Sequence, residues 1–455
     1  MEKRRKKSWT KRFWNCLPYV AFITMVVVMG LTLGKNKLAE NTPITMKNST
    51  LVEESVAFNL EQWDFSHSTV TQSVSQSVSE NQLFDLEQWD VSHSVATQSI
   101  PQSAPANQLN EKKFQDVGED IDLQSSAELV EFTGRVEHIF FHPLIYDPEV
   151  AFKRKDAKDL DSWMVTVSEY KKMLNSIYQK DFILVHLSDI YQEQESNGSR
   201  KMLRKKLMLP KGKKPLVISY DDVNYYQYMR ESGIVHKIIL GEDQEIWDYS
   251  IDQQGRIQIS KERDVITILN EFVKTHPDFS WKGAKGTIGL TGFEGILGYH
   301  TFGDSPNRQS EIESVRPIIH QLKATGWDFA SHTFGHPNLV NISLEKLKSD
   351  ADRWQSEVEP LIGSTNILLY PYGADPQNDR QKMEYLIGKN FRLFCSVGKE
   401  SYVDMNNRFS VIFMDRRHPD GTTLRNHREE YLDLYDAVEV MDPLRSLVTS
   451  YSNAP

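Results

Sequence analysis

The chain has 455 residues, more than one average domain needs, and a formal net charge of −10. The first twelve residues carry +6, so the rest of the chain carries −16. A nucleic-acid backbone is bound through clustered Lys and Arg, and this acidic remainder argues against such a partner. The two cysteines, Cys16 and Cys395, are predicted not to pair. The domain that contains Cys395 must therefore be held together by its apolar core alone.

Two segments at the start of the chain predict a membrane anchor. Residues 1–15 are basic, and residues 16–34 are mostly apolar and contain no charged side chain. At about 1.5 Å per residue, a helix of this length matches a hydrocarbon core of about 30 Å. No small-x-small cleavage site follows, so we expect an uncleaved single-pass signal anchor in the cell membrane rather than a signal peptide. The basic flank is expected to stay in the cytoplasm, which places the rest of the chain outside the cell.

Residues 35–130 are polar and rich in Ser, Gln, Asn, Thr and Glu. They contain a repeat with a period of 26 residues, in which residues 58–68 and 84–94 share the core Leu-Glu-Gln-Trp-Asp. The composition predicts a disordered stalk that holds the next domain away from the membrane. Alternatively, Trp63 and Trp89 are short docking motifs for a wall or protein partner, in which case the chain is an anchored scaffold.

From residue 131 to 445 the chain alternates between apolar runs and amphipathic helices, and residues 446–455 are expected to form a C-terminal tail. Strands are expected at residues 136–144, 182–187, 215–220, 286–290, 327–331, 366–370 and 391–397, and a hairpin at 246–259. Helices are expected at residues 166–179, 263–275, 308–324, 343–362 and 377–389. A basic linker is expected between residues 201 and 214. Repeated βα units predict parallel strands in an α/β fold.

Polar residues follow three of the predicted strands. Asp221 and Asp222 come after the run Pro-Leu-Val-Ile-Ser-Tyr, and His332 and His336 come after Trp-Asp-Phe-Ala-Ser. A turn containing Pro371, Tyr372 and Gly373 follows the third run. Functional residues at the C-terminal ends of several strands are typical of a barrel enzyme, so a barrel is favoured over an open sheet.

These residue types suit a hydrolytic metal site. Such a metal needs three protein ligands and one position left for water. His332 and His336 are spaced i, i+4, so one helical turn would bring both rings to the same side. One carboxylate of the aspartate pair would complete a ligand set that suits zinc, iron, cobalt or nickel better than magnesium. The other carboxylate would be left to accept the proton of the water.

The order Ser-Tyr-Asp-Asp, His-Thr-Phe-Gly-His and Tyr-Pro-Tyr-Gly resembles the polysaccharide deacetylase family, also called the NodB homology domain. The resemblance covers roughly residues 135 to 425. It implies a distorted (β/α) barrel in which Asp221 is the catalytic base and Asp222, His332 and His336 bind a divalent metal, with zinc as the expected ion. It also implies that the backbone amide of Tyr372 helps to hold the oxyanion, and that a late histidine, here His418, is the general acid.

The chain departs from the family pattern at two positions. Val223 replaces the common glycine after the aspartate pair, and Leu369 replaces an arginine that orients the base. We expect another cation, from residues 415–417, to take over that role. Together with the predicted membrane anchor, the resemblance leads us to expect a membrane-anchored, outward-facing deacetylase that acts on N-acetyl, or alternatively O-acetyl, groups of a cell-wall or surface polysaccharide. The alternative is a catalytically weak or inactive glycan-binding module on the same barrel, which the two departures motivate.

Overall fold

The computed structural model describes residues 128–448, with the exception of residues 197 and 407. The predicted basic segment and membrane helix, and almost all of the predicted stalk, lie outside the described residues. Residues 449–455 of the predicted tail do so as well. None of the helices within the described ranges is long and apolar enough to cross a membrane.

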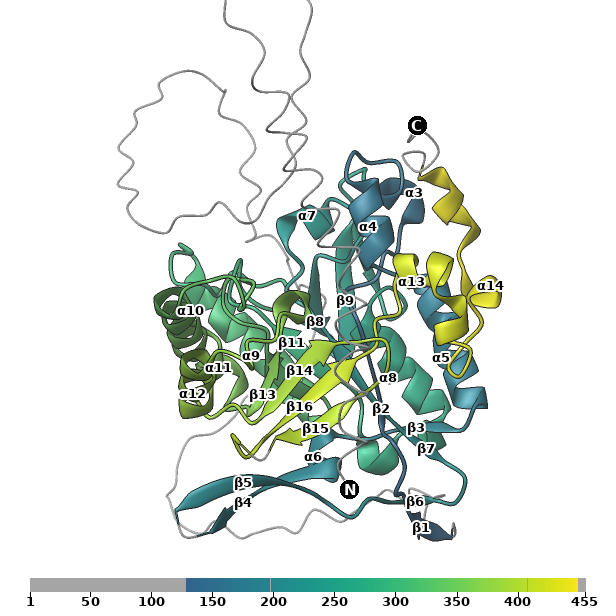
Figure 1. Cartoon of the computed structure of the whole chain (residues 1–455). Coiled ribbons are helices and arrows are strands. Elements are labelled where there is room, and N and C mark those ends of the chain that lie inside the picture. Colours follow the sequence, from purple (N-terminus) through teal and green to yellow (C-terminus); the bar gives the residue numbers. More distant parts are fainter. Residues whose placement is uncertain (1–127, 197, 407, 449–455) are drawn as a thin grey trace, which may run out of the picture. The chain divides into compact units, whose positions relative to one another are not determined.

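A curled sheet of mainly parallel strands forms the centre of this part of the chain (Figure 1). The strand order is β15-β16-β14-β13-β12-β11-β7-β2, and β3 also pairs with β7. All pairs are parallel except β15 with β16. The strands are β2 (Glu137–Phe141), β3 (Phe182–Leu184), β7 (Lys214–Tyr220), β11 (Thr287–Leu290), β12 (Asp328–Ser331), β13 (Ile367–Leu369), β14 (Leu393–Val397), β15 (Val403–Asn406) and β16 (Val411–Arg416).

The two ends of the curl meet where β16 returns to β2. Ile139 and Arg417 form a parallel bridge. The amide of Phe140 donates to the carbonyl of Arg417 at 3.0 Å, and the amide of Arg417 donates to the carbonyl of His138 at 3.0 Å. The expected α/β class is therefore confirmed, and the sheet curls into an incomplete barrel.

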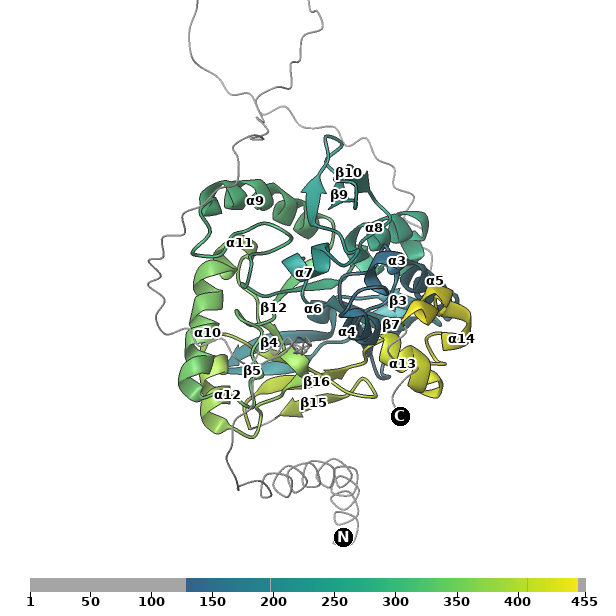
Figure 2. The same cartoon turned by 90° about the horizontal axis from the view of Figure 1, so that it is seen from above.

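Helices lie around the outside of the sheet in two groups (Figure 2). The group α9 to α12 lies on one side, and α5, α8, α13 and α14 lie on the other. The helices are α3 (Pro148–Ala151), α4 (Ala157–Trp163), α5 (Val167–Gln179), α6 (Leu187–Ile190), α7 (Gln227–Arg230), α8 (Val265–Thr275), α9 (Arg308–Ala324), α10 (Leu344–Glu357), α11 (Glu359–Ile362), α12 (Arg380–Gly388), α13 (Gly421–Asn426) and α14 (Ala437–Val440).

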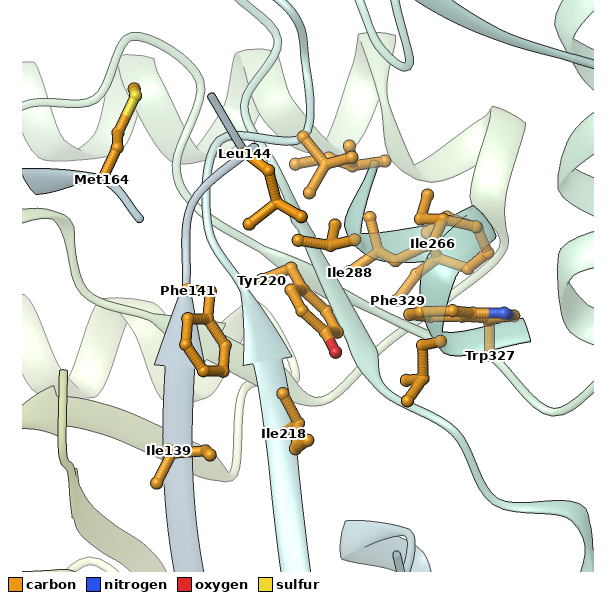
Figure 3. Packing of buried hydrophobic residues seen from close by; sticks show 14 of the residues in the cluster. Ile139, Phe141, Leu144, Met164, Ile218, Tyr220, Ile266, Ile288, Trp327 and Phe329 are labelled. Carbon is orange, nitrogen blue, oxygen red and sulfur yellow. The ribbon is translucent and has the colours of Figure 1, made fainter. Parts of the chain in front are cut away.

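The sheet separates two apolar cores. Successive strand residues point to opposite faces, so Ile218 and Tyr220 of β7 pack in the larger core with Trp327 and the helices (Figure 3). Val217 between them packs in the smaller core inside the curl, which also contains Cys395. Cys395 is a buried free thiol.

Three small antiparallel sheets extend the barrel. They pair β1 (Leu129–Glu131) with β6 (Met208–Pro210), β4 (Tyr191–Ser196) with β5 (Ser199–Arg204), and β9 (Ile246–Ile251) with both β8 (Lys237–Leu240) and β10 (Ile257–Ser260). The hairpin predicted at 246–259 is confirmed as β9 and β10.

Two local predictions are wrong. The basic linker at 201–214 instead contains part of β5 and all of β6, because Met202 and Leu209 supply apolar side chains to the smaller core. The helix predicted over 343–362 is broken at Val358, because Pro360 at the start of α11 has no N–H to continue the helical ladder.

Candidate metal centre and catalytic site

Asp222, His332 and His336 come together at the C-terminal ends of β7 and β12. One ligand atom from each lies within 4.8 Å of the others. The Nε2 atom of His332 is 3.9 Å from Oδ1 of Asp222, and the Nε2 atom of His336 is 3.6 Å from Oδ2. Ligand atoms bound to a tetrahedral ion at about 2.1 Å lie about 3.4 Å apart. Two imidazole nitrogens and one carboxylate at these separations therefore fit a divalent ion of the zinc type.

The backbone fixes which nitrogen of His332 faces this centre. Its Nδ1 atom is 2.8 Å from the carbonyl oxygen of Leu369, which can only accept, so Nδ1 carries the proton. The lone pair of Nε2 is then left for a metal, which is the usual arrangement of a ligating histidine. Burial lowers the pKa of His336 below its ordinary value, which also favours the neutral form that binds metal.

The loop that carries His336 is not the predicted helical turn. Residues 332–336 are irregular, and both Thr333 and His336 have positive φ, at 66° and 54°. The carboxylate of half-buried Asp350 in α10 holds this loop, since it accepts from the amides of Phe334 at 2.8 Å and Gly335 at 2.7 Å. The ring centroids of His332 and His336 still lie 4.8 Å apart. The loop therefore brings both rings together, as the helical turn was expected to do.

Asp222 is held in place by its own strained backbone and by a tyrosine. Its φ of 59° lies in the left-handed region, which a non-glycine residue adopts only under strain. The hydroxyl of Tyr226 lies 2.8 Å from Oδ1 of Asp222 and 2.6 Å from the hydroxyl of Thr291. Burial alone would raise the pKa of Asp222, but His336, His332 and His142 together with the Tyr226 hydrogen bond hold it below its ordinary value.

Asp221 forms a buried bidentate ion pair with Arg416 at the end of β16. The two guanidinium nitrogens donate at 2.7 and 2.9 Å, and the Arg416 side chain is fully buried. Burial would raise the pKa of Asp221, but the charges of Arg416 and His332 hold it well below its ordinary value. The cation expected from residues 415–417 to contact Asp221 is therefore Arg416.

The turn at 371–373 lies beside the metal ligands. Tyr372 has a φ of 58°, and its ring packs edge-on against His336 with centroids 4.6 Å apart. Its side chain is 58% exposed, so the ring itself lies at the rim of the centre. The part predicted for its backbone amide stays a prediction.

His418 follows β16 and belongs to a cluster of aromatic rings on the other strand ends. Its Nδ1 atom is 3.1 Å from a carboxylate oxygen of Asp420, and its ring stacks on Phe140 at 4.1 Å. Its buried Nε2 atom has no hydrogen-bond partner among the described residues. The ring of His142 lies 4.9 Å from the ring of His418, and the Nδ1 atom of His142 is 3.1 Å from the carbonyl oxygen of Trp163. Burial, aided by His418, lowers the pKa of His142 to about 4.

Sequence reasoning did not identify Tyr226, Asp350 and Asp420 as parts of this site. Tyr226 and Asp420 each lie within four residues of a predicted site residue, so chain proximity was an available signal. Asp350 lies in the middle of a helix, where an aspartate normally indicates an exposed position, and no local pattern marks its contact with the histidine loop.

A family comparison supports the resemblance. Residues 304–388 match the model of the polysaccharide deacetylase family. This segment contains His332, His336 and the 371–373 turn, so the family resemblance inferred from the motifs is confirmed there. No curated protein matches the chain significantly.

The chain is also similar, at low sequence identity, to several solved structures. The deacetylase PplD of Streptococcus pyogenes, solved with acetate, has 13% identity and a TM-score of 0.36, over 68% of this chain and 99% of that one. A polysaccharide deacetylase from Bacillus cereus has 11% identity and a TM-score of 0.37, over 64% and 66%. A CE4 family pseudoenzyme from Bacillus anthracis has 12% identity and a TM-score of 0.22, over 37% and 55%.

Proposed function

We propose that the protein is a metal-dependent deacetylase that hydrolyses N-acetyl, or alternatively O-acetyl, groups of a cell-wall or surface polysaccharide. The observation that carries this proposal is the ionised Asp221, held by Arg416 beside the ligand set of Asp222, His332 and His336. We further propose that residues 16–34 anchor the chain in the cell membrane with the catalytic domain outside, on the hydropathy and charge of that segment.

A divalent ion, with zinc proposed, would supply Lewis acidity that polarises the acetyl carbonyl and acidifies the attacking water. The lowered pKa of Asp221 makes its carboxylate a weak base, which needs an acidic proton donor. Water acidified in this way would be such a donor. Asp221 accepts the proton of the water through its carboxylate. Arg416 keeps that carboxylate ionised and fixes its orientation through two parallel hydrogen bonds.

Two further groups complete the reaction. The backbone amide of Tyr372 donates to the oxyanion that develops on the carbonyl oxygen. The Nε2 atom of His418 gives a proton to the leaving amine, while Asp420 holds the other nitrogen of the ring. The Asp420 carboxylate beside Nδ1 fixes the orientation of the imidazole, and a general acid must be held in such an orientation.

Acetate release from acetylated oligosaccharides, with and without a chelator, tests the proposal. Asp221→Asn should lower turnover at least about a hundredfold while the bound metal is retained. His332→Ala should lose the metal as well, whereas the matched control His320→Ala, at an exposed position of α9, should change neither. Metal content that survives His332→Ala unchanged would overturn the site.

A glycan-binding module without hydrolysis is the second candidate. Its main support was the missing arginine at position 369, and Arg416 now supplies that contact. Val223, the other departure, is fully buried and packs in the larger core, so it is explained by packing. Binding of acetylated glycans without any acetate release would favour this candidate over the enzyme.

A further inference from the structure

A strongly basic segment lies outside the candidate site. Residues 200–214 contain most of β5, all of β6 and the first residue of β7. Eight of these fifteen residues are Lys or Arg, and none is Asp or Glu, although the chain after its first twelve residues carries a net charge of −16. We call residues 200–214 the basic face. Its cations are Arg200, Lys201, Arg204, Lys205, Lys206, Lys211, Lys213 and Lys214.

Four of these cations are already neutralised by carboxylates. The ion pairs are those of Arg200 with Glu193 and Glu195, Lys206 with Glu131, Lys211 with Glu128, and Lys213 with Asp278. Pairs of this kind leave little charge for an outside partner, so they do not distinguish the segment from an ordinary solvated surface.

The other four cations of the basic face keep their charge. Within residues 128–448, apart from positions 197 and 407, no carboxylate forms an ion pair with Lys201, Arg204, Lys205 or Lys214. Arg204 and Lys205 instead donate to backbone carbonyl oxygens at 2.8 and 2.7 Å, and Lys214 lies 4.7 Å from the centre of an aromatic ring. Lys205 is half-buried and the other three are exposed. These uncharged contacts orient the side chains without cancelling their charge.

The basic face lies at the end of the barrel opposite the metal ligands. Lys214 is the first residue of β7, and Asp221 follows the last residue of that strand, so the seven residues of β7 separate them by about 20 Å. β5 lies at the same end, because the amide of Met202 donates at 3.1 Å to the carbonyl of Ser410, which precedes β16. Figure 1 shows β5 and β6 at the lower edge, far from α7, which follows Asp222.

The chain enters the described domain at this same end. β1 begins at Leu129 and pairs with β6, where Leu129 lies opposite Pro210. Residues 16–34, the proposed membrane anchor, lie upstream of that strand. The anchor is therefore connected to the domain through its basic end and not through the end that carries the metal ligands.

We propose that the basic face binds the anionic headgroups of the membrane that holds the anchor, so that the candidate site points away from the lipid. Each cation close to an anionic lipid surface strengthens association about fivefold. The attraction falls off within about 8 Å at physiological salt, so only cations at the lipid-facing end contribute. This inference rests on the proposed anchor, because the anchor favours a membrane over a soluble polyanion as the occupant.

The test measures how close the basic face comes to lipid in the full-length chain. The chain is reconstituted in vesicles of phosphatidylcholine, with or without added phosphatidylglycerol, that carry an acceptor dye on their headgroups. In a Cys16→Ser background, Gln192→Cys in β4 receives an impermeant donor dye at an exposed position near the basic face. Energy transfer should be higher in the anionic vesicles than in the neutral ones, and high salt should abolish the difference.

A second dye position reports the orientation of the domain. Gln309 is exposed in the first turn of α9, and a helix that precedes a parallel strand begins at the C-terminal end of the sheet, where the metal ligands lie. A donor dye on Gln309→Cys should therefore show less energy transfer than the dye on Gln192→Cys in anionic vesicles. Equal transfer from the two positions would overturn the proposed orientation.

Matched charge variants separate the basic face from net charge. The first variant combines Lys201→Gln, Arg204→Gln, Lys205→Gln and Lys214→Gln, and it should lose the difference between the two kinds of vesicle. The control combines Arg316→Gln, Lys323→Gln, Lys346→Gln and Lys348→Gln, at exposed positions of α9 and α10, and it should keep that difference. Urea unfolding should show the same midpoint for both variants, and the salt dependence of the wild type tests the proposal without any variant.

Three outcomes would overturn the membrane surface: equal energy transfer of the wild type in both kinds of vesicle, an equal loss in the control variant, or binding of soluble polyphosphate without any effect of anionic lipid. Failure of the anchor gives a different result, since a high-salt wash would then release the chain from neutral vesicles. Flotation with anionic vesicles at low salt, lost in the first variant only, would in that case still support the basic face.

Discussion

The ion pair between Asp221 and Arg416 gives the sharpest test of the site's electrostatics. Replacing Arg416 by Met keeps an unbranched side chain without the guanidinium and leaves Asp221 buried with no cationic partner there. Removal of one member of a buried ion pair costs about 3–5 kcal/mol, so the free energy of unfolding should fall by that order at neutral pH. The pKa of Asp221 should rise above its ordinary value of 3.8, since burial then acts without Arg416.

The sign of the pH dependence follows from these pKa changes. In the wild type the lowered pKa of Asp221 contributes stability above about pH 4, and that stability is lost only as the pH falls towards the folded-state pKa. In Arg416→Met the pKa is raised, so the deficit is largest at neutral pH and shrinks on acidification. Urea unfolding at several pH values measures the change in the free energy of unfolding, and the pH profile of acetate release measures the change in the pKa of Asp221.

A second substitution provides the control. Asp221→Asn should destabilise the wild type, because it leaves a buried guanidinium without its carboxylate. The same change in the Arg416→Met background should stabilise, because it removes an uncompensated charge. The reasoning is refuted if Arg416→Met costs less than about 1 kcal/mol at pH 7, or if Asp221→Asn has the same sign in both backgrounds.

Two further predictions concern other parts of the described domain. Burial raises the pKa of Asp264 to about 7, so this group contributes a loss of stability as the pH rises from about 4 through 7. Asp264→Asn should remove that contribution from the pH dependence of urea unfolding, while Asp248, Asp350 and Asp375, whose pKa values are raised to about 6, keep theirs, and Asp304→Asn on the surface should not change it. Gly292→Ala would place a Cβ 2.2 Å from the ring of Phe334 and push the loop that carries His336. Metal titration should show about tenfold weaker binding, whereas Gly388→Ala, with no neighbour within 4 Å, should bind normally.

The sequence predicted the parallel strands well because their signal is local. Each buried strand is a short apolar run, and the polar residues that follow it mark its end. Asp222, His332 and His336 were therefore placed correctly at strand ends without knowledge of the strand order. The break of the predicted 343–362 helix at Val358 could also have been read from Pro360, which follows two residues later.

Contacts between distant elements could not be read in this way. The sequence indicated only that some cation from residues 415–417 should reach Asp221. The choice of Arg416 over Arg417 depends on the side of β16 that faces the interior of the curl. Arg417 instead bonds to Glu137 and Asp433. Likewise, the apolar residues Met202 and Leu209 lie among many lysines, and only the tertiary core reveals why that segment forms strands.

The bond between Arg416 and Asp221 joins residues 195 positions apart, and Arg416 lies on the last strand of the sheet. Closing so long a stretch of chain is entropically costly and slow. During synthesis, the nascent domain therefore cannot form this ion pair until that final strand has left the ribosome. Premature termination between residues 336 and 416 yields a product that carries Asp222, His332 and His336 but lacks the guanidinium that holds Asp221.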